Sequence, residues 1–154
     1  MKNKGFTLME LAVGVALAAL LVWMVANGMQ QAKKNATLAK TQAQISGLIT
    51  AIKMYEIDTE YYPGENNKTL IEALTTDNEV PGWKGPYIKI KKSELNENRE
   101  YLDAWGNVFI YINPGINNIS SYDLYSKGPD GKGDGNGEDD IKSWGEESGE
   151  ESDI

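Results

Sequence analysis

The 154-residue sequence contains neither cysteine nor histidine. Without cysteine, the chain forms no disulfide framework and no thiolate metal site. Without histidine, it lacks the commonest general base and the commonest ligand of transition metals. These two absences argue against catalysis, and they leave the small soluble part of the chain without a covalent staple.

Proline is also absent before Pro63, and good helix formers fill positions 29–57. Apolar side chains recur there every three to four residues, which is the spacing of one face of a helix. They are Leu38, Ile45, Leu48, Ile49, Ile52 and Tyr55. We therefore predict one helix from Phe6 to about Ile57, whose second half packs this apolar stripe against the rest of a small domain.

The net charge of −8 is confined to the C-terminal part of the chain. Residues 121–154 hold 11 Asp or Glu against 3 Lys, whereas residues 1–120 carry equal numbers of acids and bases. Because phosphate contacts need a concentrated basic surface, the sequence predicts no nucleic-acid partner. The composition of residues 145–154 predicts a disordered acidic tail.

A long apolar run follows a short positive start. Lys2 and Lys4 precede the run, and their charges should stay in the cytoplasm. The run is near the roughly 20 residues that span a bilayer and is longer than the apolar region of a secretory signal. A cleaved secretory signal is the alternative, but its small-residue cleavage site would lie inside the run. We predict a transmembrane segment over residues 6–28.

Glu10 interrupts this apolar run. A carboxylate in the middle of a membrane helix costs on the order of 3 kcal/mol, so it needs a partner. Lys2 and Lys4 stay at the cytoplasmic edge and supply none. A cut after Gly5 would create an α-amino group on Phe6, which a neighbouring copy shifted along the helix axis would present to Glu10. The alternative is a carboxylate that snorkels to the membrane surface on its own.

Shorter elements follow the long helix. Residues 66–74 predict a second helix, capped by Asn66 or Asn67. Residues 108–112 and 121–126 predict two strands joined by a turn, which together form an antiparallel hairpin. A helix packed on a small antiparallel sheet is an α+β domain.

The N-terminal residues resemble a known processing signal. Lys2-Asn3-Lys4-Gly5 followed by Phe6-Thr7-Leu8-Met9-Glu10 is similar to the signal of type IV prepilins and type II secretion pseudopilins. The resemblance implies a leader peptide of residues 1–5 and a prepilin peptidase that cuts after Gly5 and methylates Phe6. It also implies that Glu10 pairs with the N-terminus of a neighbouring subunit during assembly.

The rest of the chain, as far as Trp144, resembles the major (G-type) pseudopilins of type II secretion. The motifs that carry the resemblance are Tyr61-Tyr62-Pro63, Trp83-Lys84-Gly85-Pro86-Tyr87, Asp103-Ala104-Trp105-Gly106-Asn107, Asp123-Leu124-Tyr125-Ser126-Lys127-Gly128-Pro129-Asp130-Gly131 and Asp140-Ile141-Lys142-Ser143-Trp144. The sequence departs from the family at Ala104, where proline is usual, in lacking a proline near Asn27, and in its acidic extension. We predict that the aromatic residues of these motifs fill gaps between loop and helix.

Four aspartates interleaved with glycines lie near the C-terminus: Asp130, Asp134, Asp139 and Asp140. Several oxygens on a flexible chain suit a hard cation, although the spacing does not fit an EF-hand, and a solvated acidic loop is the alternative. The family resemblance implies a structural Ca²⁺ ion in this loop. Its ligands would be Asp130 and Asp140, with Asp139, Asp134 and backbone carbonyls near Lys127 and Lys132 as further candidates.

The resemblance implies a type IV pilin-like α+β fold. In that fold a long N-terminal helix, with a membrane-spanning first half, packs on a small antiparallel β-sheet that carries a C-terminal Ca²⁺-binding loop. Residues 29–144 would form a periplasmic domain, anchored in the bacterial inner membrane by a single pass.

The function that this implies is a structural subunit of the type II secretion pseudopilus, which polymerises into a helical filament and drives export of folded proteins across the outer membrane. Its expected partners are further copies of the chain, the prepilin peptidase, minor pseudopilins and an inner-membrane assembly platform. The first alternative is a type IV or competence pilin that forms a surface fibre. Many such pilins close a C-terminal loop with a disulfide, so the lack of cysteine favours a secretion pseudopilin over a surface pilin. A monomeric membrane-anchored Ca²⁺-binding domain and an enzyme are the remaining alternatives.

Overall fold

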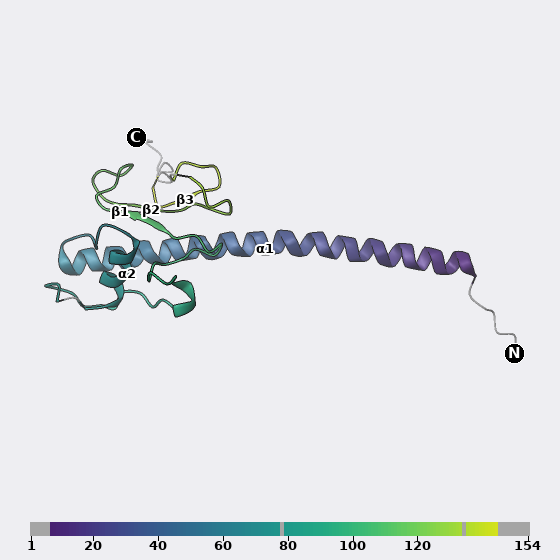
Figure 1. The fold of residues 1–154 in the computed structure, drawn as a ribbon, viewed down its shortest axis with the longest axis horizontal. Helices are drawn as coiled ribbons and strands as arrows, with labels where there is room; N and C mark the ends of the chain where they lie inside the picture. The colour runs from purple at the N-terminus through teal and green to yellow at the C-terminus, as the bar shows by residue number, and fades with distance from the viewer. Residues whose placement is uncertain (1–6, 78, 134, 145–154) are drawn as a thin grey trace, which may run out of the picture. The chain divides into compact units, whose positions relative to one another are not determined.

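The computed structural model of the chain describes residues 7–77, 79–133 and 135–144 (Figure 1). The predictions on the leader peptide, on Gly5, Phe6 and Asp134, and on the acidic tail lie outside these residues. In chain order, the elements are α1 (Leu8–Thr59), α2 (Asn67–Thr75), the short 3-10 helix η1 (Lys92–Glu94), β1 (Ile110–Ile112), β2 (Asp123–Ser126) and β3 (Ile141–Lys142). A long N-terminal helix and a small antiparallel sheet confirm the predicted α+β fold class.

The chain divides into two compact units, residues 1–36 and 37–154, and the division falls within α1. The helix continues without interruption through Asn27 and Gly28. In the first unit, the side chains of residues 7–24 and 28–36 are all exposed. Within the described residues, α1 is the one helix long and apolar enough to cross a membrane, with a mean hydropathy of 2.3 over its most apolar window. The predicted limits of the membrane segment and of the periplasmic domain stay predictions.

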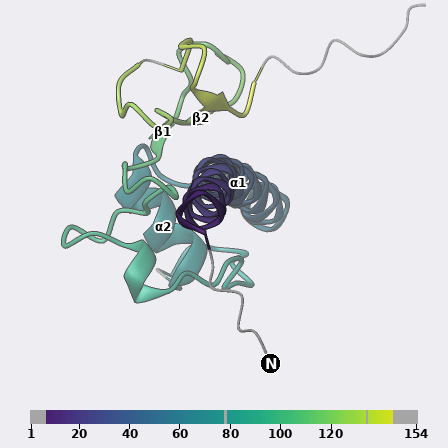
Figure 2. The same ribbon diagram turned by 90° about the vertical axis from the view of Figure 1, so that its right-hand side faces the viewer.

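The second half of α1 carries the core of the second unit. Its buried residues follow the predicted helical spacing, and the hairpin and α2 cover different sides of this half of the helix (Figure 2). The core cluster contains Ile45, Leu48, Ala51, Ile52, Tyr55, Leu70, Ile71, Leu74, Tyr101, Phe109, Tyr111 and Leu124. Each large apolar side chain that is fully buried contributes about 1.5–3 kcal/mol. The stripe is confirmed from Ile45 onward, whereas Leu38 is exposed.

The C-terminal end of α1 is set by a left-handed residue and a following proline. The Thr59 hydroxyl donates to the Tyr55 carbonyl (2.8 Å), and the Glu60 N–H donates to the Glu56 carbonyl (2.8 Å). Glu60 has a φ of 67°, which turns the chain out of the helix. Pro63 then prevents the helix from resuming, because it has no N–H to donate.

Two asparagines fix the start of α2. Asn66 is the N-cap: its side chain accepts the Thr69 N–H (3.1 Å), and the Thr69 hydroxyl accepts the Asn66 N–H (3.1 Å). Asn67 points inward and is buried. Its Oδ1 accepts the Tyr101 N–H (2.7 Å), and its Nδ2 donates to the carbonyls of Tyr101 (3.2 Å) and Phe109 (2.7 Å). Asn67 thus fastens α2 to the chain that leads into β1.

The sheet has the order β1-β2-β3, and both pairings are antiparallel. The predicted hairpin is confirmed, with Tyr111 opposite Leu124. β1 begins two residues later than predicted, because Val108 pairs with Leu102 in a separate bridge. We did not predict β3, which has only two residues and shows no alternating pattern of its own.

Candidate functional site

The N-terminal end of α1 is held by two residues of the processing signal. The Glu10 N–H donates to Thr7 Oγ1 (3.2 Å), and the Thr7 N–H and hydroxyl both donate to Glu10 Oε2 at 3.5 Å. This reciprocal pattern is a capping box with Thr7 as the N-cap. We did not predict this role of Thr7, although the spacing T-x-x-E is visible in the sequence. Glu10 is exposed in the first turn, and among the described residues its carboxylate accepts only the two 3.5 Å hydrogen bonds from Thr7.

Apart from Glu10, the segment from Leu8 to Met24 presents an exposed apolar surface. The large apolar side chains from Leu8 to Met24 are all more than half exposed. A contiguous apolar surface of this extent is typical of a site of contact with a membrane or with other protein chains.

The loop between β2 and β3 follows a path that glycine adopts most easily. Its glycines with positive φ are Gly128, Gly131, Gly133 and Gly135. A Cβ atom added at Gly133 would lie 2.5 Å from Asp140 Oδ2, and one added at Gly137 would lie 3.0 Å from the same oxygen. The glycines therefore let the backbone close tightly around the Asp140 carboxylate.

Asp140 is the acidic residue that this loop holds most firmly. Its Oδ2 accepts the N–H groups of Gly135 (3.0 Å) and Gly137 (2.8 Å). Its Oδ1 is buried and has no hydrogen-bond partner within the described residues. A buried carboxylate oxygen without a partner is costly, so this oxygen is available to a cation.

The other predicted ligands in the described part of the loop do not gather around the Asp140 carboxylate. Asp130 is exposed, and its Oδ1 accepts the Lys132 N–H (2.8 Å). Asp139 lies with its backbone carbonyl against Gly128, and Lys127 is half-buried. Across residues 7–77, 79–133 and 135–144, no three acidic side chains converge as a metal-binding group. The Ca²⁺ site stays a prediction.

The start of the loop is anchored by a buried carboxylate from a distant part of the sequence. Asp103 Oδ1 accepts the N–H groups of Trp105 (2.9 Å) and Asn107 (2.8 Å), and its Oδ2 accepts the Ser126 hydroxyl (2.6 Å). The Ser126 oxygen in turn accepts the Gly128 N–H (3.2 Å), and Asn107 Nδ2 donates to the Gly128 carbonyl (2.8 Å). We did not predict this role of Asp103, although its motif was part of the family resemblance.

The end of the loop is held on β2 by an aromatic contact. The rings of Trp144 and Tyr125 meet edge to face with their centroids 5.6 Å apart, and Gly135 packs against the indole. The Ser143 N–H donates to the Leu124 carbonyl (2.9 Å). The loop is therefore held at its start through Asp103 and Asn107 and at its end by contacts with β2.

A long exposed apolar helix, an N-terminal capping box and a small α+β domain with a closed glycine-rich loop define the class of pilin-like subunits. Residues 28–144 match the family model described as Type II secretion system (T2SS), protein G, and residues 1–26 match the Prokaryotic N-terminal methylation motif. The chain belongs to the type II secretion system protein G family.

Similar proteins agree with this assignment over nearly the whole chain. The type II secretion system core protein G of Escherichia coli K12 is 35% identical over 147 residues, covering 94% of this chain and 92% of that protein. The core protein G of Vibrio cholerae serotype O1 is 32% identical over 149 residues, covering 93% and 92%. The crystal structure of the major pseudopilin of enterohaemorrhagic E. coli matches with a TM-score of 0.51 and 28% identity, over 75% of this chain and 92% of that chain.

Membership of this family makes the chain a pseudopilin, which is a structural subunit of the type II secretion system. The methylation motif implies processing by a prepilin peptidase and assembly into a pseudopilus. The apolar first half of α1 is consistent with anchoring in a membrane.

Proposed function

We propose that the chain polymerises into the helical filament of the type II secretion pseudopilus and that growth of this filament drives export of folded proteins across the outer membrane. The observation that supports the proposal is the exposed apolar surface from Leu8 to Met24 in a member of the protein G family. Lateral packing of this segment from many copies would bury that surface. Contacts of the head-to-tail kind that do not close into a ring generate a filament.

The proposal includes the processing of the precursor and its position in the cell. The prepilin peptidase cuts between Gly5 and Phe6 and methylates Phe6. Residues 6–28 then cross the bacterial inner membrane once, and residues 29–144 lie in the periplasm. Minor pseudopilins and an inner-membrane assembly platform start and extend the filament.

In the filament, Glu10 pairs with the new N-terminal ammonium group of a neighbouring copy. The hydrogen bonds from Thr7 to Glu10 Oε2 are 3.5 Å long, so they hold the carboxylate weakly. An ammonium group at ordinary hydrogen-bond distance forms a stronger, charge-assisted bond and displaces them. The pairing also removes the cost of an isolated carboxylate inside the assembled apolar helices.

Two substitutions at Glu10 test this step. Glu10→Ala should leave membrane insertion intact and abolish filament assembly, measured by electron microscopy of sheared filaments. Glu10→Gln is the matched control, because glutamine still completes a capping box but carries no charge. The charge-pairing mechanism expects both variants to fail, whereas assembly by Glu10→Gln at the wild-type level would show that capping alone is the role.

We also propose that the loop from residue 127 to residue 140 binds a structural Ca²⁺ ion. The unpartnered, buried Oδ1 of Asp140 supports the proposal, because a cation would satisfy an oxygen that has no hydrogen-bond partner within the described residues. Asp130, Asp139, Asp134 and backbone carbonyls near Lys127 and Lys132 would supply the remaining oxygens. The ion would neutralise the clustered carboxylates and close the loop.

Removing Ca²⁺ tests this site. Extracellular sites of this kind bind at about 0.1–1 mM. At about ten times Kd, linkage stabilises the folded domain by about 1.4 kcal/mol, which corresponds to a rise of about 4–7 °C in Tm for a domain of this size. Adding a chelator to the fragment that begins at Gly28 should reverse that rise. Asp140→Asn should show little Ca²⁺ response, and an unchanged Tm in the wild-type fragment would argue against the ion.

A further inference from the structure

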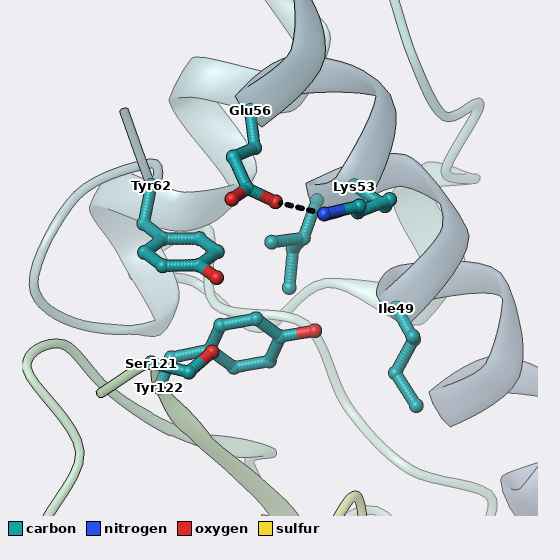
Figure 3. Close-up of a pocket in the computed structure, with 7 residues that line it drawn as sticks. Ile49, Lys53, Glu56, Tyr62, Ser121 and Tyr122 are labelled. Atoms are coloured by element: carbon teal, nitrogen blue, oxygen red, sulfur yellow. Dashed lines mark hydrogen bonds and ion pairs between the residues drawn. The ribbon is translucent and has the colours of Figure 1, made fainter. Parts of the chain in front are cut away.

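A pocket of about 220 Å³ lies between the second half of α1 and the residues just before β2 (Figure 3). One wall is apolar and is formed by Ile49 and Ile52 of α1. The opposite wall is formed by Tyr62, Ser121 and Tyr122, and the two tyrosine rings meet edge to face with centroids 5.3 Å apart. We name this cavity the tyrosine pocket.

An ion pair of α1 borders the tyrosine pocket. Lys53 Nζ lies 2.8 Å from Glu56 Oε2, and the Lys53 side chain is 64% exposed while that of Glu56 is 26% exposed. Burial raises the pKa of Tyr122 to about 12, and the neighbouring Tyr62 and Glu56 add to the rise, so its hydroxyl is neutral at physiological pH. The least solvated charge at the pocket is therefore the Glu56 carboxylate. A carboxylate beside aromatic rings favours a cation with an apolar stem, such as an arginine side chain.

A tight turn at residues 96–100 displays the only arginine of the sequence. Asn96 Oδ1 accepts the N–H groups of Asn98 (3.0 Å) and Glu100 (2.9 Å), and the Arg99 N–H donates to the Asn96 carbonyl (3.0 Å). Arg99 has a φ of 66°, a conformation that costs a residue with a side chain on the order of 1 kcal/mol. Its side chain is exposed, and the guanidinium has no partner in the part of the chain that the structure describes.

The turn and the tyrosine pocket lie on opposite sides of α1. At the base of the turn, Glu94 lies 3.9 Å from Lys40, and Gln44 Nε2 donates to the Leu102 carbonyl (3.1 Å). Lys40 is about half a turn around the helix from the pocket residues of α1 and roughly 14–24 Å from them along the axis. Both views show η1, which leads into the turn, on the side of α1 away from the hairpin (Figures 1 and 2).

We propose, on the basis of the filament proposed above, that Arg99 of one copy enters the tyrosine pocket of a neighbouring copy and pairs with Glu56. The charges on the turn are opposite to those that border the pocket, which favours Arg99 as the group that enters it. The turn displays Glu97 and Arg99, both exposed, and the pocket is bordered by the opposite charges, Lys53 and Glu56. Because Lys53 is mostly solvated, it can exchange Glu56 for Glu97 at little cost.

This contact has the geometry that filament growth requires. The turn and the tyrosine pocket lie on opposite sides of α1, so a single neighbour cannot engage both, and each copy offers its turn to one neighbour and its pocket to another. Such a heterologous contact does not close within a pair of copies and therefore propagates along the assembly.

Cross-linking in assembled filaments tests the contact, because the sequence has no native cysteine. We expect the double variant Glu56→Cys with Arg99→Cys, treated with a short bis-maleimide, to give a ladder of dimers, trimers and longer species. Each single variant is the matched control and should stay monomeric, because the contact brings together two different positions. Filaments of the double variant that stay monomeric after treatment would overturn the proposal.

Charge reversal tests the same pair without a cross-linker. Glu56→Arg and Arg99→Glu should each lower filament yield by about tenfold, since a like-charge contact costs at least 1.4 kcal/mol. Combining the two should restore the yield, with circular dichroism checking that each variant is folded. Single variants with the wild-type yield would refute the contact while leaving the filament intact. A wild-type chain that forms no filament in the same cells would instead refute the proposed function.

Discussion

Asp123 stabilises the long turn of the hairpin, and replacing it with asparagine gives a quantitative test of the fold. The residue is fully buried at the start of β2. Its Oδ2 accepts the N–H groups of Ile116 (2.9 Å) and Asn117 (2.8 Å) and the Asn117 side-chain amide (3.1 Å), while Oδ1 accepts the Asn118 N–H (2.9 Å). Four donors thus converge on one carboxylate.

Asp123→Asn changes the chemistry of this contact and keeps its shape. The amide oxygen can take the place of Oδ2, but its three hydrogen bonds lose their charge assistance, at about 0.5–1 kcal/mol each. The amide nitrogen then faces the Asn118 N–H, and a buried donor without an acceptor costs about 1–3 kcal/mol. Because these effects share one site and are not additive, we expect a loss of about 3–4 kcal/mol in the free energy of unfolding.

The pH dependence gives an independent check. Burial raises the pKa of Asp123, but the hydrogen bonds from the N–H groups of Asn117, Asn118 and Ile116 together lower it by more than burial raises it. The pKa of Asp123 therefore lies below its ordinary value. A carboxyl group with a lowered native pKa stabilises the fold above its unfolded pKa and loses that contribution as pH falls through the native value. The difference in stability between wild type and Asp123→Asn should therefore be full at pH 7 and shrink below about pH 4.

Urea unfolding of the fragment that begins at Gly28, followed by circular dichroism, measures both effects. The midpoint should fall with little change in m-value, since the surface exposed on unfolding is the same. Asp77→Asn is the matched control: Asp77 accepts one N–H, from Glu79 (2.9 Å), in an exposed turn, and we expect a loss below about 1 kcal/mol. A loss of that small size for Asp123→Asn, or a difference independent of pH, would refute the account of the turn.

Two further predictions concern stability at pH 7. Gly128→Ala should destabilise the fragment by more than about 2 kcal/mol, because Gly128 has a φ of 63° and a Cβ there would collide with the Asp139 carbonyl. The control Gly106→Ala has a φ of 92° but open space around the added Cβ, so it should cost only about 1–2 kcal/mol. Equal losses for the two variants would contradict the packing argument. Asn67→Ala removes three buried hydrogen bonds and should cost about 2–4 kcal/mol in thermal or urea unfolding, whereas a loss within 0.5 kcal/mol would show that those bonds contribute little.

The parts of the fold that the sequence predicts are those with a local periodic signal. The spacing from Ile45 to Tyr55 predicts the buried face of α1, and the alternating segment before Lys127 predicts β2. That alternation does not give one buried and one exposed face, because all four residues of β2 are buried. Asp123 binds the hairpin turn and Tyr125 lies under Trp144, so both faces of the strand are covered.

Periodic patterns along the sequence do not predict most of the contacts that hold the candidate sites. Ser126 and Asp103 are 23 residues apart, and nothing in the spacing of either motif says that their side chains meet. Likewise, the sequence shows that Asp140 is acidic, but not that one of its oxygens is satisfied by glycine N–H groups while the other lacks a partner. These arrangements depend on tertiary packing, which a pattern along the chain does not encode.

The uncovered apolar length of α1 from Leu8 to Met24 has a thermodynamic consequence for the proposed filament. Lipid tails are as apolar as leucine and valine side chains, so moving this segment from a bilayer into a bundle of its own kind gains little from expulsion of water. Stored subunits and polymerised subunits would then differ by a small free energy. Because the free energies of subunits in the membrane and in the filament would be so close, an external motor could decide whether the filament grows or shortens. Disassembled subunits could also return to the membrane and be used again.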